Sequence, residues 1–183
     1  MPSIVVLAGS PSATSRTAAV LELLALRLAT HGHDVRVVPI RELSPGPLLA
    51  ADAHHPAISD VVEAVAAARG LIVASPVYKA SYIGLLKAFL DLLPQYALAG
   101  KTVLPLVTGG TRAHVLAVDY ALRPVLAAMG AHVGQGYFLL DQLISVGAGT
   151  GPTLAPAAER PLLGIIDAFF ESVAAFQPVT VTV

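Results

Sequence analysis

The stretch GLIVASPVYKASYIGLLKAFLDLLP (residues 70–94) reads as a strand, a loop and a helix in succession. Residues 70–74 form a short apolar run with β-branched side chains, typical of a strand that is buried on both faces. Residues 83–93 carry apolar side chains at helical spacing, and Pro94 predicts the end of that helix. A strand followed by a helix is the repeating unit of a parallel sheet.

The same unit recurs along the whole chain. Predicted strands span residues 3–9, 34–40, 70–74, 101–110 and 131–140. Predicted helices span residues 15–32, 57–69, 83–93, 112–129 and 157–176. This alternation implies right-handed crossovers and a parallel sheet with helices on both faces. Five strands in 183 residues fit a doubly wound α/β fold with the flavodoxin-like order 2-1-3-4-5, in a single domain over residues 1–183.

A few segments depart from the pattern. Residues 41–56 and 142–156 are rich in proline or glycine and are predicted as loops, the first with at most a short turn. Gly134 and Gly136 are expected to interrupt the fifth strand. Pro124 is expected to disturb its helix, because proline removes a donor and crowds a carbonyl of the preceding turn. The final PVTVTV fits either an edge strand or a loose tail.

Composition excludes several classes of protein. The chain is 55% hydrophobic and 13% charged, unlike a disordered sequence. Its apolar runs are shorter than the roughly 20 residues that span a bilayer, and its N-terminus lacks a basic leader. We therefore expect a soluble, cytoplasmic protein whose apolar surface is buried in the sheet and in contacts between subunits.

Charge and cysteine content narrow the chemistry further. A net charge of −1 offers no electrostatic footprint for nucleic acid or a membrane surface. The chain has no cysteine, which excludes disulfides and thiol redox chemistry, so any redox reaction must use a bound cofactor. The histidines have no carboxylate partners at metal-ligand spacing, and no metal site is expected.

In a doubly wound sheet, ligands bind beyond the carboxyl ends of the strands. The loop after the first strand, GSPSATSRT (residues 9–17), places hydroxyls and Arg16 at the start of a helix. Free amides and the helix dipole make such a terminus an anion site, although serine and threonine are equally common there as ordinary N-caps.

The loop after the third strand contains Tyr78, Lys79 and Tyr82. The two rings either form a wall for a flat heteroaromatic ligand, or fill a gap in the core while Lys79 points to solvent.

The loop after the fourth strand is TGGTRAH (residues 108–114). Its two glycines allow the backbone to come close to a ligand, or they simply form a tight turn before an N-cap. By position, His114 would reach the edge of a flat ligand, but a lone histidine is more often a hydrogen-bonded structural residue.

Four segments resemble one enzyme family: LAGSPSATSRT, GLIVASPVYKASYIGLLKAFLDLLP, GKTVLPLVTGGTRAH and LAVDYALRPVLAAMGA. They are similar to the NAD(P)H-dependent FMN reductases of the flavodoxin-like superfamily, and most of all to the reductase partner of two-component alkanesulfonate monooxygenases. The resemblance runs from Ile4 to Phe138, and the C-terminal part matches only in general character.

The resemblance implies a set of flavin contacts. The FMN phosphate would be held by Ser10, Ser15, Arg16 and Thr17. The isoalloxazine ring would be lined on one side by Pro76, Val77, Tyr78 and Lys79, and on the other by Thr108, Gly109, Gly110 and Thr111, with His114 at its edge. Many broader relatives have an arginine where this chain has Ser12, which leaves Arg16 as the only nearby cation. Tyr120 would lie in a π-helical bulge at a subunit interface of a homo-oligomer, a dimer or tetramer.

The implied reaction is NAD(P)H + FMN → NAD(P)⁺ + FMNH₂, with hydride passing directly to flavin N5 and no side-chain acid or base. The implied cofactors are FMN and either NADPH or NADH, and FMNH₂ would pass to a monooxygenase. One alternative is a quinone or azo reductase that retains FMN. Another is a non-catalytic flavodoxin-like electron carrier, which the charge of −1 disfavours because such carriers are usually strongly acidic.

Overall fold

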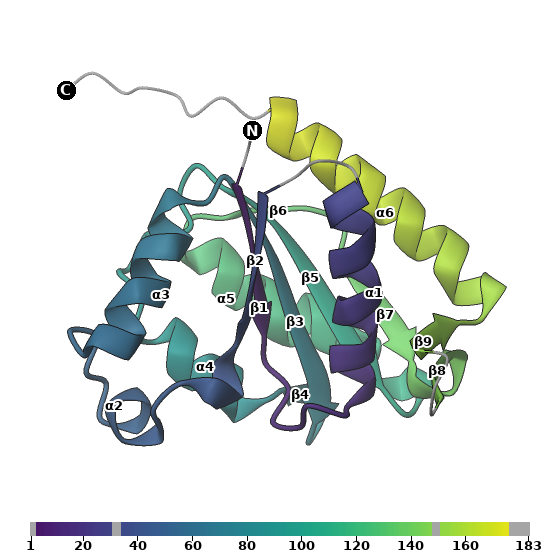
Figure 1. Cartoon of the computed structure of the whole chain (residues 1–183), viewed down its shortest axis with the longest axis horizontal. Helices are drawn as coiled ribbons and strands as arrows, with labels where there is room; N and C mark the ends of the chain where they lie inside the picture. Colours follow the sequence, from purple (N-terminus) through teal and green to yellow (C-terminus); the bar gives the residue numbers. More distant parts are fainter. Residues whose placement is uncertain (1–2, 31–33, 148–150, 176–183) are drawn as a thin grey trace.

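A sheet of parallel strands runs through the middle of the protein, with helices on both sides (Figure 1). The computed structural model describes residues 3–30, 34–147 and 151–175. The strands lie in the order β2-β1-β3-β5, and both β6 and β7 pair with β5 at the far edge. Their bounds are β1 Ser3–Ala8, β2 Asp34–Pro39, β3 Gly70–Tyr78, β5 Thr102–Gly109, β6 His132–Val133 and β7 Tyr137–Leu140.

β6 and β7 are the two halves of the predicted fifth strand. They pair in parallel with the start and the end of β5, and the gap between them holds Gly134 and Gly136. Counted as one strand, they complete the order 2-1-3-4-5, which confirms the predicted flavodoxin-like class. A Cβ on Gly136 would lie 2.4 Å from Cγ1 of Val118, so this crossing has no room for a side chain.

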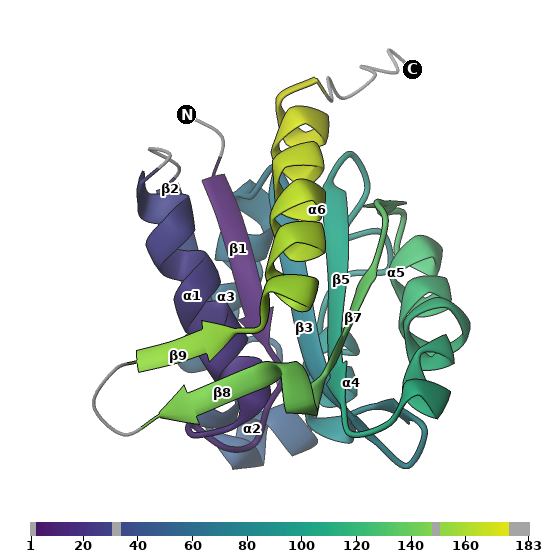
Figure 2. The ribbon, with the colours of Figure 1, turned by 90° about the vertical axis from the view of Figure 1, so that its right-hand side faces the viewer.

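Two layers of helices cover the sheet. α1 (Arg16–Thr30) and α6 (Pro156–Ala175) pack on one face, as the view in Figure 2 shows. α3 (Pro56–Ala67), α4 (Gly84–Leu90) and α5 (Arg123–Ala128) pack on the other. No helix within the described ranges is long and apolar enough to cross a membrane.

Strand β3 shows why the core has two halves. Leu71 and Val73 belong to the apolar cluster on the α3 face, whereas Ile72 and Ala74 belong to the cluster on the α1 face. All four side chains are fully buried, because alternate residues of a strand point to opposite faces. A central strand covered on both sides accounts for the continuous apolar run GLIVA.

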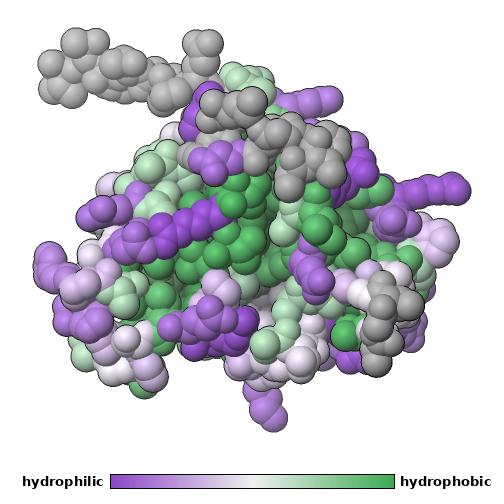
Figure 3. Space-filling view, in the orientation of Figure 1, coloured by the Kyte–Doolittle hydropathy of each residue, from purple (hydrophilic) through white to green (hydrophobic). Residues whose placement is uncertain are grey.

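β2 forms the edge of the sheet that lies away from β6 and β7, and this edge faces the viewer in Figure 1. In the same orientation, Figure 3 shows apolar surface in the middle of this face, with hydrophilic side chains around it. Val37 on β2 is 40% exposed, whereas the side chain of Arg36 pairs with Asp60 of α3. The ion pair lowers the pKa of the Asp60 carboxyl through the hydrogen bond from Arg36.

The structure differs from the sequence prediction at residues 142–156, which were expected to form a loop. The segment instead contains an antiparallel hairpin, β8 (Ile144–Gly147) and β9 (Gly151–Leu154), after a short 3-10 helix, Asp141–Leu143. The prediction was wrong because the high glycine and proline content of this segment indicated a loop, although the segment also carries two apolar residues that pair across the hairpin. Ile144 is buried opposite Leu154, and both pack with the core that faces α1.

The other segments with irregular sequence follow the predictions more closely. Residues 41–56 are mostly irregular, but they contain one helix that was not predicted: the five-residue α2 (Pro45–Leu49) follows the 3-10 turn Ile40–Glu42, and α3 begins at Pro56. The helical stretch before Pro124 is disturbed as expected: a 3-10 helix, Arg112–His114, is followed by a π-helix, Val118–Leu122, and only then by α5. The predicted edge strand or tail at 178–183 lies outside the described residues.

Candidate functional site

A pocket of about 400 Å³ lies where the loops after β1, β3 and β5 meet. Its lining residues come from the first loop and the start of α1, from the ends of β3 and β5, and from the segment after β7: Thr14, Ser15, Arg16, Thr17, Pro76, Tyr78, Thr108, Asp141, Ile144 and Val146. The volume falls in the range of small-molecule sites. The structure thus has a pocket beyond the carboxyl ends of the strands, where the predicted strand order places a ligand site.

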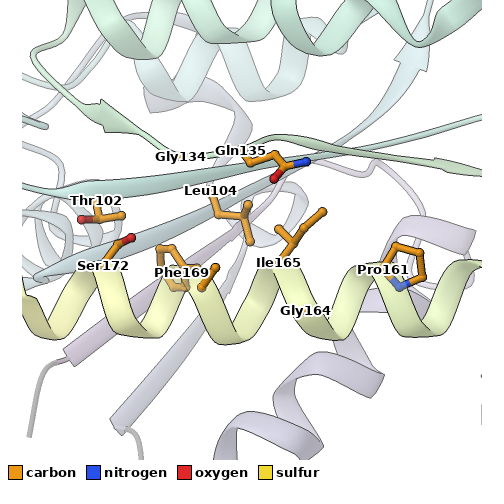
Figure 4. A pocket seen from close by; sticks show the side chains of 10 residues that line it. Thr102, Leu104, Gly134, Gln135, Pro161, Gly164, Ile165, Phe169 and Ser172 are labelled. Atoms are coloured by element: carbon orange, nitrogen blue, oxygen red, sulfur yellow. The ribbon is translucent and has the colours of Figure 1, made fainter.

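A second pocket, of about 340 Å³, lies between α6 and the start of β5. Figure 4 shows Ile165 and Phe169 extending from α6 toward Leu104 of the sheet. This pocket is lined mainly by apolar groups and contains no residue of the three loops. We therefore place the functional site in the first pocket.

The first loop is anchored against strand β3. The amide of Gly9 donates a hydrogen bond to the carbonyl of Ala74 at 2.8 Å, and a Cβ on Gly9 would lie 2.9 Å from that oxygen. Ser10 is buried, and its hydroxyl lies 3.3 Å from both the amide and the carbonyl of Ser12. Ser10 therefore shapes the turn from within rather than lining the pocket.

Helix α1 begins at the pocket with an N-cap. The hydroxyl of Ser15 accepts a hydrogen bond from the amide of Ala18 at 3.1 Å. The amides of Arg16 and Thr17 precede the first intrahelical bond and have no acceptor within the helix. Together with the helix dipole and the exposed guanidinium of Arg16, these donors form a set that suits a phosphate group.

A buried hydroxyl pair joins the first and third loops. Oγ1 of Thr17 lies 2.7 Å from Oγ1 of Thr108, and the two residues are 1% and 2% exposed. One hydroxyl of the pair donates to the other, so the accepting hydroxyl keeps its own proton for a further acceptor. The pair holds two walls of the pocket together and leaves one O–H donor at its floor.

The second loop is a tight hairpin. β3 continues to Tyr78 and pairs with β4 (Ser81–Tyr82) across a two-residue turn, Lys79 and Ala80. Both turn residues have positive φ, 50° and 62°, which costs energy for side chains other than glycine. At the base of the hairpin the Ser75 hydroxyl accepts from the amide of Ile83 at 3.0 Å and donates to the carbonyl of Pro76 at 2.9 Å.

The two tyrosines of this hairpin have different roles. Tyr78 is 53% exposed and lines the pocket together with Pro76. Tyr82 is half-buried against the core, and burial raises the pKa of its phenol. Val77 also packs against the core, because it alternates with its two neighbours along the strand. The side chain of Val77 therefore does not line the pocket, and Lys79 is exposed at the hairpin tip.

In the third loop, the backbone of Gly109 and Gly110 follows Thr108 at the end of β5. Thr111 is an N-cap, since its hydroxyl accepts from the amide of Ala113 at 3.1 Å. His114 lies behind the glycines: its Nδ1 is buried without a hydrogen bond and would be 3.4 Å from a Cβ on Gly109. Neither Thr111 nor His114 lines the pocket.

Sequence reasoning missed the fourth wall of the pocket, formed by Asp141, Ile144 and Val146. Ile144 and Val146 belong to the segment that was predicted as a loop, and Asp141 directly precedes that segment. One signal was available. Strand pairing places Leu140 beside Gly109, so the residue that follows β7 must reach the same rim as the glycine loop.

The segment around Tyr120 is a π-helix, the local form that the family resemblance implied. Tyr120 is 79% exposed, and Leu116, one turn earlier, is 58% exposed. Arg123 braces the helix: Nε donates to Asp119 at 2.8 Å, and the guanidinium also donates to the carbonyls of Val133 and Gly134. The interface role of Tyr120 stays a prediction.

A sequence profile of the family described as "NADPH-dependent FMN reductase" matches residues 2–144. The chain belongs to this family. It is 43% identical to "FMN reductase (NADPH)" of Pseudomonas putida, over 93% of this chain and 88% of the relative. It is 49% identical to the protein of the same name in Escherichia coli K12, over 77% of this chain and 74% of the relative.

A solved structure supports the same assignment for this FMN reductase. The apo form of an NADH:FMN oxidoreductase, EMOB, superposes with a TM-score of 0.85 at 43% identity, covering 98% of this chain and 94% of the other. The protein is thus an NAD(P)H:FMN oxidoreductase, with FMN and a nicotinamide nucleotide as its cofactors. Within the described part of the reductase, no group of three or more His, Asp or Glu side chains forms a metal site.

The pocket of the reductase fits FMN on its own chemistry. Its donor set at the start of α1 suits the phosphate, and Tyr78 and Pro76 provide an apolar wall for a planar ring. Arg16 and Asp141 are the only charged side chains among the described residues that line the pocket.

Proposed function

We propose that this reductase binds FMN as an exchangeable substrate, reduces it with NAD(P)H and passes FMNH₂ to a partner monooxygenase that oxidises alkanesulfonates in sulfur assimilation. The observation that carries the proposal is the pocket at the sheet rim, where the start of α1 and the tyrosine hairpin face one ligand volume. The monooxygenase partner follows from the family resemblance of the sequence blocks.

The phosphate of FMN would be held by the first turn of α1. The amides of Arg16 and Thr17 donate to it, the guanidinium of Arg16 adds the positive charge, and the free O–H of the Thr17–Thr108 pair adds a neutral donor. Ser15 contributes indirectly, because its hydroxyl caps the helix and fixes these amides. Ser10 likewise acts through the shape of the loop.

The ring would lie between the hairpin wall and the glycine loop. Pro76 and Tyr78 line the pocket on the hairpin side, and Gly109 and Gly110 directly follow Thr108, which also lines it. When bound, the flavin supplies an N5 atom that accepts hydride from the nicotinamide. The protein positions the two reactants and needs no side-chain acid or base for this step. His114 supports the glycine loop from behind.

The pocket is open enough for exchange. Two residues that line the pocket, Tyr78 and Val146, are 53% and 54% exposed, and Arg16 is the only cation that lines the described pocket. Small-molecule sites usually bury most of their ligand, and this lining leaves large parts of its walls open to solvent. The openness therefore favours an exchangeable flavin over the alternative of a quinone or azo reductase with tightly bound FMN.

We further propose that the chain forms one domain, works in the cytoplasm and assembles as a homotetramer. The cytoplasm is where its nicotinamide substrate is available. The exposed apolar side chains Val115, Leu116 and Tyr120 lie together on the segment that contains the π-helix, and such a patch suits a subunit contact.

Anaerobic stopped-flow absorbance tests the activity and the mode of binding together. Protein freed of flavin is mixed with FMN and either NADPH or NADH, and the flavin band at about 450 nm should bleach, since hydride transfer reduces the ring. Protein that leaves gel filtration colourless and needs added FMN supports exchange. Protein that stays yellow and reduces quinones without added FMN would contradict it, and no bleaching with either nucleotide would contradict the activity.

A further inference from the structure

The side chain of Asp141 lies beside the glycine loop. Leu140 pairs with Gly109 in the sheet, and Asp141 follows directly, at the rim where the strands end. One carboxylate oxygen, Oδ2, is 3.7 Å from the position that a Cβ on Gly110 would occupy. Since Gly110 has no side chain, nothing of its own shields the loop backbone from this oxygen.

The Asp141 carboxylate is not engaged by other groups of the protein. Within the described ranges no hydrogen bond or salt bridge includes its side chain, whereas Asp60, Asp91 and Asp119 each pair with an arginine or lysine. Asp141 is half-buried and lines the pocket. An unpaired carboxylate in a ligand pocket acts on whatever charge the ligand carries there.

Reduction changes that charge. NAD(P)H passes one hydride, which is two electrons and one proton, so NAD(P)⁺ leaves and the flavin ring gains one negative charge until it takes up a second proton. The phosphate is the same before and after the reaction. A carboxylate near the ring therefore affects the reduced form more than the oxidised form, whereas its repulsion of the phosphate is common to both.

We propose that Asp141 is a positioning residue for product release: its carboxylate lowers the affinity of the pocket for reduced FMN relative to oxidised FMN. This inference rests on the proposed function, in which the pocket takes FMN as an exchangeable substrate. Repulsion at the glycine loop opposes the attraction at Arg16, so the site holds the substrate and expels the product. This order of affinities would favour the supply of FMNH₂ to a partner enzyme.

The test compares dissociation constants for oxidised and reduced FMN, the latter prepared and titrated anaerobically. In Asp141→Asn the ratio of the reduced to the oxidised constant should fall about fivefold, the order expected for one partly exposed unit charge near another. For a two-electron couple this raises the midpoint potential of bound FMN by about 20 mV. Asp141→Glu keeps the charge and should keep the wild-type ratio. Asp167→Asn removes an exposed carboxylate on α6, outside the pocket, and should change nothing.

Each other outcome has a definite meaning. If Asp141→Asn weakens both redox forms equally, the carboxylate is a hydrogen-bond acceptor for the ligand, and the inference is wrong. If the ratio does not change, or changes equally in Asp167→Asn, the inference is also wrong. If the wild-type protein binds neither form of FMN, the proposed function fails and the inference fails with it, which separates the two cases.

Discussion

The hydroxyl pair Thr17–Thr108 allows the structure to be tested by a double-mutant cycle. Thr17→Val leaves the buried hydroxyl of Thr108 without its partner at 2.7 Å, and Thr108→Val does the same to Thr17. A buried polar group left unsatisfied costs about 1–3 kcal/mol, whereas replacement of both partners by apolar groups of similar shape is nearly neutral. The double variant should therefore be destabilised by less than either single variant.

The assay is urea unfolding followed by circular dichroism, with the free energy of unfolding taken from the midpoint and slope. The singles should each lose about 1–3 kcal/mol, and the coupling energy should be of the same size. Thr153→Val, at an exposed position of β9, is the matched control and should change stability by less than about 0.5 kcal/mol. Additive losses, or single variants no worse than the control, would show that the pair does not join the two loops.

Four further predictions address the site, the hairpin, alkaline stability and assembly. Arg16→Gln should weaken FMN binding about tenfold in fluorescence titrations and leave riboflavin binding unchanged, because only FMN has the phosphate. Ala80→Gly should raise the free energy of unfolding by about 1 kcal/mol, since glycine adopts φ of 62° without strain. Burial raises the pKa of the Tyr137 phenol above its ordinary value of 10.0. The neutral phenol therefore stabilises the fold fully below pH 10, and this stabilisation is lost as the pH rises through the folded-state pKa. Tyr137→Phe should flatten the alkaline decline of the free energy of unfolding measured by urea titration. Tyr120→Ser should lower the molar mass measured by light scattering without reducing the thermal midpoint of the subunit fold, and an unchanged mass would remove Tyr120 from the interface.

The fold could be predicted because its signals are local and mutually consistent. The central strands are short apolar runs, and strands alternate with helical patterns along the chain, so the parallel sheet and the rim of the site could be inferred from the sequence pattern. The β8–β9 hairpin could not be predicted in this way. Its stability comes from contacts of Ile144 and Leu154 with a core assembled from distant parts of the chain, and no local pattern records such contacts.

The site shows the same division. The sequence placed Arg16, Tyr78 and Thr108 at one rim, and the structure brings them into one pocket. It did not show that Val77 faces the core, because the strand continues past the predicted end at Ala74 and alternation then decides the direction of each side chain. The predicted end of the fifth strand at Leu140 was the one signal for Asp141, and the position of Asp141 beside the glycine loop depends on the register between β7 and β5.

The close approach of Gly136 to Val118 couples the far edge of the sheet to the π-helix. Val118 is the first residue of the π-helix, and its Cγ1 occupies the space that a Cβ at position 136 would need. Any larger residue at position 136 would therefore have to displace Val118, and with it the start of the segment that carries Tyr120. A single methyl group at the sheet edge would in this way disturb the surface proposed for subunit contact.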